Sequence, residues 1–150
     1  MTIIYIDADA CPVKDETYRV ASRYALLVYV VANSWMRMPD DPQIRLEVVG
    51  DGFDAADDWI AERAGAGDVV VTDDIPLAAR CIAAGALVIT TRGERRDTNS
   101  IGDAMAMREL MQYMRAAGEV GGGPKALDER DRRHFRQELD KVVTAALRAG

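Results

Sequence analysis

Aspartates recur in groups along the first half of the chain, and each group adjoins a short apolar run. Asp7 and Asp9 end the first run, and Asp73 and Asp74 follow a later one. A third group surrounds the start of a predicted helix and consists of Asp51, Asp54, Asp57 and Asp58. Carboxylates within a few ångströms of one another repel and resist ionising together, and a divalent cation relieves that repulsion. Oxygen ligands indicate Mg²⁺ or Mn²⁺, and such an ion suits the hydrolysis of phosphodiester bonds.

A single aspartate at the start of a helix has a simpler explanation. Its side chain accepts a hydrogen bond from a free backbone amide, and its charge complements the helix dipole. Capping alone accounts for Asp9, Asp54 or Asp74 when each is taken singly. It explains one acid for each helix, however, and not pairs of acids after separate strands. The groups taken together therefore favour a metal or catalytic site over capping alone.

The apolar pattern alternates between short runs typical of strands and amphipathic segments typical of helices. Strands separated by helices predict right-handed crossovers and a parallel sheet, so the fold class is α/β. We expect a single three-layer α/β/α domain over 1–150, with a five-stranded, mainly parallel sheet and the C-terminal helices of 99–150 packed on it. The predicted strands lie at 3–6, 28–32, 44–49, 69–72 and 86–90, and the predicted helices begin after Pro12, at Asp54, at Asp74, near 99 and near 128.

The loops after the carboxyl ends of parallel strands share one edge of the sheet, and ligands bind there where the strand order reverses. If the first and fourth strands are neighbours, all three groups of aspartates converge on that rim. Asn33 ends the second strand and would reach the same rim to orient water or phosphate; a turn residue is the equal alternative. Arg92, Arg95 and Arg96 follow the fifth strand on the same side, where they predict contacts to phosphates, with a solvated loop as the alternative.

The composition limits the class of protein. The chain has 150 residues, 49% of them hydrophobic, which suffices for the core of one domain. No run approaches the roughly 18 apolar residues of a membrane helix, and no secretion signal is visible. Cys11 and Cys81 make no disulfide framework, and with His134 they make no zinc-binding pattern, so we expect a reducing, cytoplasmic setting. The net charge of −6 argues against a protein that coats nucleic acid.

The Asp-x-Asp pair at the end of the first strand also resembles the first motif of haloacid-dehalogenase-type phosphatases. In those enzymes the first aspartate, here Asp7, is the nucleophile, and the second, here Asp9, is the general acid. The order of the motifs disagrees, because an acidic motif like the one at 50–54 belongs near the end of that fold, after a Ser/Thr motif and a lysine motif. A phosphatase that uses Asp7 stays an alternative, as does a protein that binds a metal or a partner without catalysis.

With these residues assembled, the chain resembles a bacterial family of uncharacterised proteins, the YaiI/YqxD group (UPF0178). The resemblance extends over nearly the whole chain and rests on many short motifs in the same order. They read DADACP at 7–12, VAN at 31–33, GFDAAD at 52–57, GDVVVT at 67–72, DIPLA at 74–78, RGER at 92–95, GGP at 122–124 and a DRxxF helix start at 131–135. The family is similar to PIN-like domains, many of which are metal-dependent ribonucleases with an acidic cluster on a parallel sheet.

The resemblance implies a PIN-like Mg²⁺- or Mn²⁺-dependent nuclease that acts on RNA. It places the metal ligands and catalytic acids on Asp7, Asp54 and Asp74, with Asp9 and Asp57 in support. Asp73 and Asn33 are further supporting positions. Asp58 and Asp73 rank lower, because the family pattern leaves their positions open.

Several other residues have structural explanations that we prefer. Cys11 lacks a histidine nearby in the sequence and is expected to be a packed small residue rather than a nucleophile. Trp35 lies in a loop, where it would stack on a base or, as we prefer, pack on the sheet edge together with Met36 and Met38. Trp59 lies at a core position. The methionines at 105, 107, 111 and 114 fall mostly on one helical stripe, typical of core or of a partner surface, so a homodimer is compatible with the sequence.

Overall fold

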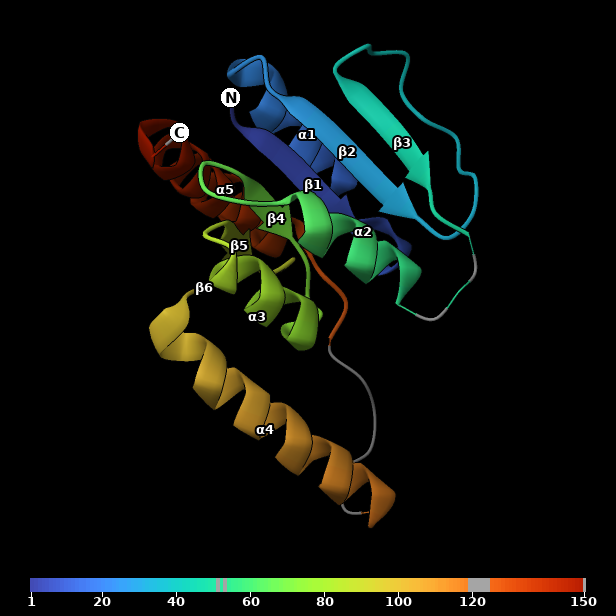
Figure 1. Ribbon diagram of the computed structural model, residues 1–150, viewed down its shortest axis with the longest axis vertical. Helices are drawn as coiled ribbons and strands as arrows, with labels where there is room; N and C mark the ends of the chain where they lie inside the picture. Colours follow the sequence, from blue (N-terminus) through green and yellow to red (C-terminus); the bar gives the residue numbers. More distant parts are fainter. Residues whose placement is uncertain (51, 53, 119–124, 150) are drawn as a thin grey trace.

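The computed structural model describes residues 1–50, 52, 54–118 and 125–149. Asp51 of the third acidic group therefore lies outside the described residues, as do Phe53 of the motif at 52–57 and the linker at 121–124 with its GGP motif. The described residues form an α/β fold in which a twisted sheet carries helices on both of its faces (Figure 1).

The sheet has the strand order β3-β2-β1-β4-β5-β6. Its first five strands in the chain pair in parallel, and only β6 runs antiparallel, against β5. The first and fourth strands are therefore neighbours, as the convergence of the acidic groups requires. The strands are β1 (Ile3–Asp7), β2 (Leu27–Ala32), β3 (Ile44–Val48), β4 (Val69–Val71), β5 (Leu87–Ile89) and β6 (Arg95–Arg96).

The sixth strand corrects the prediction of five. It lies in the charged segment at 92–97, which we predicted to be a loop. The backbone amide of Thr90 donates to the carbonyl of Glu94 at 2.8 Å, and that of Gly93 donates back to Thr90 at 3.0 Å. Gly93 has a φ of 86°, which glycine adopts without the steric cost of a side chain, so the chain reverses there. Two exposed or half-exposed arginines have no apolar alternation, and so the pattern did not reveal the strand.

Helices cover both faces and give the three predicted layers. On one face, α1 (Lys14–Arg23) and α5 (Glu129–Ala149) enclose a core with Ile4 and Ile6. On the other face, α2 (Ala55–Arg63) and α3 (Ile75–Ala83) pack on Tyr5 and Val70. The alternation of Ile4, Tyr5 and Ile6 between the two cores follows from the two-residue period of a strand. Because both faces are covered, β1 and β4 are almost entirely apolar up to their carboxyl ends.

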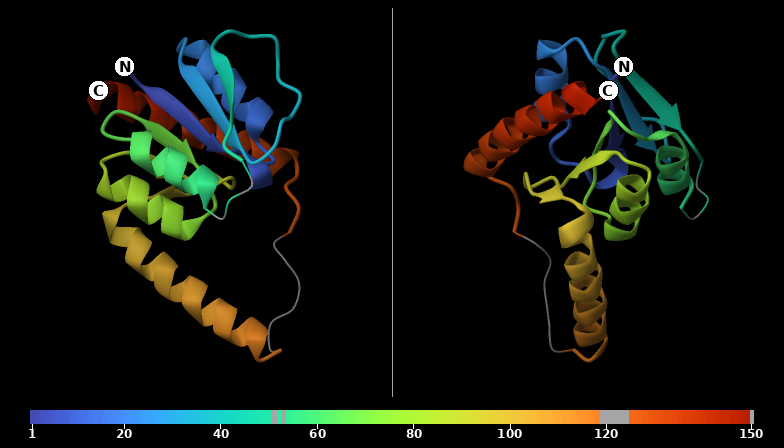
Figure 2. Two further views of the ribbon diagram at one scale, coloured as in Figure 1. Left: turned by 45° about the vertical axis from the view of Figure 1, so that its right-hand side comes forward. Right: turned by 60° about the vertical axis from the view of Figure 1, so that its left-hand side comes forward.

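The helix α4 (Thr98–Ala116) behaves differently from α5. It begins at a capping box, in which Asp97 accepts from Asn99 and Ser100. It packs against α3 and then projects from the body of the molecule, which the two views of Figure 2 show from different sides. Within the described residues of α4, Ala104 alone is buried.

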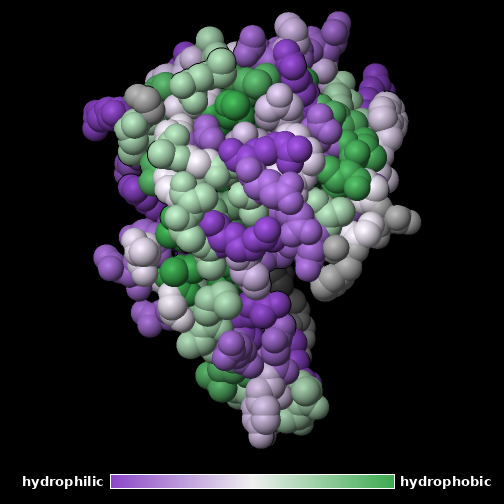
Figure 3. All heavy atoms as spheres, in the orientation of Figure 1, coloured by the Kyte–Doolittle hydropathy of each residue, from purple (hydrophilic) through white to green (hydrophobic). Residues whose placement is uncertain are grey.

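The methionines of α4 are therefore not core. Met107 is 56% exposed, and the methionines at 105, 111 and 114 are half-buried. In Figure 3 the projecting helix presents hydrophobic and hydrophilic residues side by side. That this stripe is a partner surface for a homodimer stays a prediction. Among the described residues, no helix combines the length and the apolar character needed to cross a membrane.

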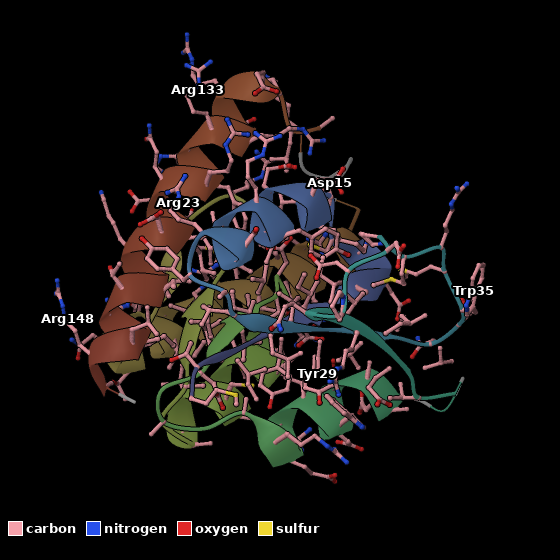
Figure 4. All side chains as sticks on the ribbon, turned by 90° about the horizontal axis from the view of Figure 1, so that it is seen from above. Asp15, Arg23, Tyr29, Trp35, Arg133 and Arg148 are labelled. Carbon is pink, nitrogen blue, oxygen red and sulfur yellow. The ribbon has the colours of Figure 1, made fainter. Side chains whose placement is uncertain are left out.

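The loop after β2 only partly matches its prediction. Met36 and Met38 pack against the core on the α1 side, as expected. Trp35 does not pack with them, because its side chain is 75% exposed and points away from the body (Figure 4). Trp59 packs on the rings of Tyr5 and Tyr29, with centroid distances of 6.0 and 5.3 Å, so its structural role is confirmed.

Candidate functional site

The acidic groups meet in a shallow hollow where the strand order reverses. The chain runs outward from β1 through β2 to β3 on one side, and continues from β4 on the other, so β1 and β4 flank the reversal. The hollow has a volume of about 230 Å³ and is lined by Asp7, Asp9, Asn33, Asp54, Asp57 and Asp74, together with small alanines at 10, 55 and 56. The structure thus brings together the three predicted ligands and three of their predicted neighbours. We refer to it below as the acidic hollow.

Thr72 holds two sides of the acidic hollow in register. Its hydroxyl donates a hydrogen bond of 2.9 Å to Oδ2 of Asp7, from β4 to the end of β1. The Oγ1 atom of Thr72 also accepts a hydrogen bond from the backbone amide of Asp74, at 2.9 Å. Thr72 is only 2% exposed, so water does not compete for these bonds. The sequence analysis did not select Thr72, although a threonine between a fully apolar strand and an aspartate pair was a usable signal.

Crowding in the acidic hollow shifts the acids toward their protonated forms. Burial, followed by the charges of Asp74, Asp7 and Asp54 and a hydrogen bond with Asp74, raises the pKa of Asp57 to about 7. Burial is also the main cause that raises the pKa of Asp7; the hydrogen bond from Thr72 opposes it, and Asp74 and Asp9 add to it. Both pKa values are raised because burial and neighbouring negative charges each disfavour the ionised carboxylate.

Helix capping was the alternative to a metal or catalytic role for three aspartates, and the structure shows a capping hydrogen bond for one of them. Asp74 is the N-cap of α3, and its Oδ1 accepts from the amide of Leu77 at 2.9 Å. Asp54 is the N-cap of α2, but within the described residues its side chain makes no capping hydrogen bond. Asp9 instead accepts from the amide of Asn33 at 3.2 Å and so ties the short 3₁₀ turn Ala8–Ala10 to the end of β2.

The backbone of Asp54 has an unusual conformation. Its φ is 63° and its ψ is 11°, in the left-handed region. Aspartate and asparagine are tolerated there better than most residues, because their short polar side chains bond locally. In Asp54 that compensation is not visible among the described residues, and the carboxylate instead lines the acidic hollow. Asp54 thus lines the acidic hollow with a backbone conformation that is sparsely populated outside glycine.

Two aspartates point elsewhere. Asp73 accepts from the amide and the hydroxyl of Thr91, at 2.8 and 2.6 Å, which fastens the loop after β4 to the end of β5. It is not among the residues that line the acidic hollow. Asp58 pairs with Arg80 at 2.8 Å between α2 and α3. The side chains of both residues thus make structural contacts, which agrees with their lower rank as candidate site residues.

The predicted phosphate-binding arginines are not brought to the acidic hollow. Arg92 donates to the carbonyl of Lys125 and lies 4.0 Å from Asp131, so it joins the turn before β6 to the start of α5. Arg95 is exposed on β6. Arg96 lies 3.8 Å from Glu94 and lines a separate groove beside α4.

The packed position predicted for Cys11 is confirmed, and Cys81 is placed in the same way. Cys11 and Cys81 are both free and buried. Burial raises the pKa of the Cys11 thiol to about 11, and that of Cys81 to about 12. Both thiols therefore remain protonated near neutral pH, which does not suit a nucleophile.

The acidic hollow offers oxygen ligands, the donors that Mg²⁺ and Mn²⁺ prefer. Among the residues that the structure describes, no group of three or more His, Cys, Asp or Glu side chains is close enough to enclose an ion as it stands. Mg²⁺ keeps several waters and is held through one or two carboxylates, so it does not require such a group. The donor chemistry fits an ion that contacts one or two of these carboxylates and reaches the others through water.

The fold and the acidic hollow define an open, mainly parallel α/β protein with a carboxylate-lined hollow at its topological switch point. The chain belongs to the YaiI/YqxD family of uncharacterised bacterial proteins, whose sequence profile matches residues 5–145.

Curated relatives span nearly the same length. A UPF0178 protein of Caulobacter sp. (strain K31) is 53% identical over 148 residues, which cover 99% of this chain and 98% of that protein. Another, of Bradyrhizobium diazoefficiens, is 56% identical over 142 residues, covering 95% of this chain and 85% of that protein. No solved structure matches the chain.

Proposed function

We propose that this protein is a Mg²⁺- or Mn²⁺-dependent nuclease that hydrolyses phosphodiester bonds in RNA. The observation that carries the proposal is the position of Asp7, Asp54, Asp57 and Asp74 around one hollow at the switch point of a parallel sheet. The raised pKa values of Asp7 and Asp57 support it, because burial, the larger cause, and the charges of neighbouring carboxylates both disfavour the ionised forms. A cation would remove that penalty.

Within this proposal, Asp7 and Asp74 are the first-choice direct ligands, since Thr72 orders both through one hydroxyl. Asp54 and Asp57 approach from the start of α2 and would reach the ion directly or through water. A bound divalent ion would polarise the phosphoryl group and lower the pKa of a bound water. Asp9, held by the amide of Asn33, supports the wall of the acidic hollow.

The arrangement of acids after β1, at the start of α2 and after β4 also supports a PIN-like assignment, because PIN-like nucleases carry acidic clusters on a parallel sheet. We take this similarity as support for the reaction class only. The choice of RNA as the substrate also comes from the similarity to PIN-like nucleases, and it belongs to the proposal.

The phosphatase alternative is less well supported. A phosphoryl group transferred to Asp7 carries charge that such enzymes neutralise with a lysine. Among the described residues that line the acidic hollow, there is no lysine or arginine. Burial also raises the pKa of Asp7, and its Oδ2 is engaged by Thr72, which weakens it as a nucleophile.

Cleavage of a labelled single-stranded RNA in Mn²⁺, compared between three proteins, tests the proposal. We expect the wild type to cleave, Asp7→Asn to lose at least about a hundredfold in rate, and Asp58→Asn to retain the rate. Asp58 is a matched control, because it lies on α2 but pairs with Arg80 outside the acidic hollow. Circular dichroism verifies that each variant is folded.

Two results would count against a nuclease. Tight Mn²⁺ binding without turnover of RNA, DNA or phosphoesters would indicate the non-catalytic binding protein. Incorporation of an aspartyl-phosphate mimic on Asp7 would indicate the phosphatase.

A further inference from the structure

A second concave surface adjoins the acidic hollow at the start of α3. It is a groove of about 560 Å³ between the start of α3 and α4, with Ile75 at one wall. Ile75 follows Asp74 directly in the chain, and Asp74 lines the acidic hollow. Two consecutive residues at the start of α3 therefore line the two surfaces, one residue for each. We refer to this second surface as the α4 groove.

Three arginines line the α4 groove. Arg96 comes from β6, and Arg108 and Arg115 come from α4. Seven residues along a helix amount to about two turns, so Arg108 and Arg115 lie on the same side of α4, about 10 Å apart along its axis. One acid, Asp103, also lines the groove, which leaves it with a clear excess of positive charge.

The arginines of the α4 groove have few acidic partners among the described residues. Arg96 lies 3.8 Å from Glu94, a weak contact. In the part of the chain that the structure describes, Arg108 and Arg115 make no ion pair. An arginine without a carboxylate partner retains its donors for a phosphate, which it binds in a two-pronged geometry.

The floor of the α4 groove is apolar. Met107 and Met111 line it, one helical turn apart, with Ala104 before them. Methionine side chains are flexible and polarisable and adapt to flat or irregular apolar partners. An apolar floor with a basic rim suits a polymer in which flat rings alternate with negatively charged phosphate groups. Single-stranded nucleic acid has this chemistry.

We propose that the α4 groove holds the single-stranded nucleic acid whose phosphodiester reaches the acidic hollow, with Arg96, Arg108 and Arg115 on its phosphates. This inference rests on the proposed nuclease function and names the surface that would bring the substrate there. Such a surface is needed because the protein has a net charge of −6 and the acidic hollow repels phosphate. The structure offers that positive surface next to the acidic hollow, on a helix that otherwise projects from the body (Figure 1).

Another basic groove competes for the same role. It has a volume of about 670 Å³ between α1 and α5, with Arg19, Arg23 and Arg133 among its lining residues. Figure 4 shows Arg23 and Arg133 on these two helices. Two of its cations are paired, because Arg23 contacts Asp140 and Lys141 lies 3.4 Å from Glu138. None of its lining residues is a chain neighbour of one that lines the acidic hollow, and among the described residues Arg19 and Arg133 make no ion pair, so these two arginines provide a matched control.

Fluorescence anisotropy with a labelled single-stranded RNA of mixed sequence, in EDTA to prevent cleavage, tests the inference. The test variant is Arg108→Ala/Arg115→Ala, and the control is Arg19→Ala/Arg133→Ala; each removes two positive charges from helix surfaces. We expect the test variant to raise Kd about tenfold at low salt. It should reduce the magnitude of the slope of log K against log salt by about 1.4, since each lost phosphate contact contributes about 0.7 for single strands. The control should keep the wild-type slope.

Equal loss in both variants, greater loss in the control or the absence of binding by the wild type would each overturn the inference. The single variant Arg115→Ala, at an exposed position, serves if the double variant is poorly folded, and should lose about half of the change in slope. Cleavage in Mn²⁺ separates the two proposals. Binding that depends on Arg108 and Arg115 without any cleavage would refute the nuclease but keep the groove; cleavage unaffected by their loss would refute the groove but keep the nuclease.

Discussion

The hydroxyl of Thr72 donates a hydrogen bond of 2.9 Å to the carboxylate of Asp7, across 65 positions of sequence. Both residues lie where their strands end, on neighbouring strands of the parallel sheet. The bond lowers the pKa of Asp7 against the effect of its burial and so favours the charged form that a cation requires. Since the same hydroxyl accepts from the amide of Asp74, one buried side chain positions two of the proposed ligands.

Replacing Thr72 with valine keeps the shape of the side chain and removes its hydroxyl. We expect the free energy of unfolding of Thr72→Val to be about 1–2 kcal/mol lower than that of the wild type, because the amide of Asp74 loses its acceptor. The pKa of Asp7 should rise further. Urea denaturation and NMR titration of the carboxyl carbon measure the two effects. Thr72→Ser keeps the hydroxyl and should restore the pKa of Asp7; a valine variant that titrates like the wild type would show that the hydrogen bond has no influence.

Asp57 makes stability depend on pH in a defined direction. Its folded pKa of about 7 lies above its ordinary value of 3.8, so its protonated form favours folding. That contribution is complete below pH 3.8 and is lost as pH rises through about 7. Asp57→Asn should therefore stabilise the protein at pH 8, with a smaller gain at pH 5 and none below about pH 4. Because the side chain is only partly buried, solvent screening reduces the gain to roughly 1 kcal/mol.

The neighbouring residue supplies the comparison for that measurement. Asp58 is exposed and pairs with Arg80, so Asp58→Asn should be neutral or destabilising by less than about 1 kcal/mol. Urea denaturation of both variants at pH 5 and pH 8 checks the difference. An Asp57 variant without extra stability at pH 8 would contradict the crowding of charges in the acidic hollow.

Protons should compete with a divalent ion for the same carboxylates. At pH 6, one unit below the pKa of Asp57, that carboxyl is mostly protonated. If Asp57 takes part in binding, Mn²⁺ affinity should fall about tenfold between pH 8 and pH 6. Calorimetric titration at the two values measures this, and the release of a proton at pH 6 would appear as a dependence of the heat on the buffer. An affinity that does not change with pH would exclude Asp57 from the site.

Asp74 has two roles that different substitutions separate. Asparagine caps a helix about as well as aspartate, so Asp74→Asn should keep the bond to the amide of Leu77 and remain within about 0.5 kcal/mol of the wild type. Asp74→Ala should lose about 1 kcal/mol, because the cap is gone. Both should weaken Mn²⁺ binding to a similar extent. If only the alanine variant does so, capping rather than metal binding explains Asp74.

Much of the fold could be predicted because its determinants are local. The apolar runs, the helix starts and the turn glycines lie within a few residues of one another, and each acts through backbone preference or amphipathic period. The sixth strand at Arg95–Arg96 escaped because two charged residues have no such pattern and pair only after the turn at Gly93 forms. The exposure of Trp35 was not predicted for the opposite reason: an aromatic side chain favours burial, but the loop offers no packed position for it.

The candidate site divides in the same way. The sequence by itself determined that acids follow three strands and that a parallel sheet gathers strand ends at one edge. Tertiary structure decided that β1 and β4 are neighbours, because strand order depends on how the helices pack on both faces. It also gave the physical reason for the lower rank of Asp73, which turns to Thr91, whereas Asp74 lines the acidic hollow. Long-range hydrogen bonds and charge crowding set the direction of a side chain, and neither exists until distant segments meet.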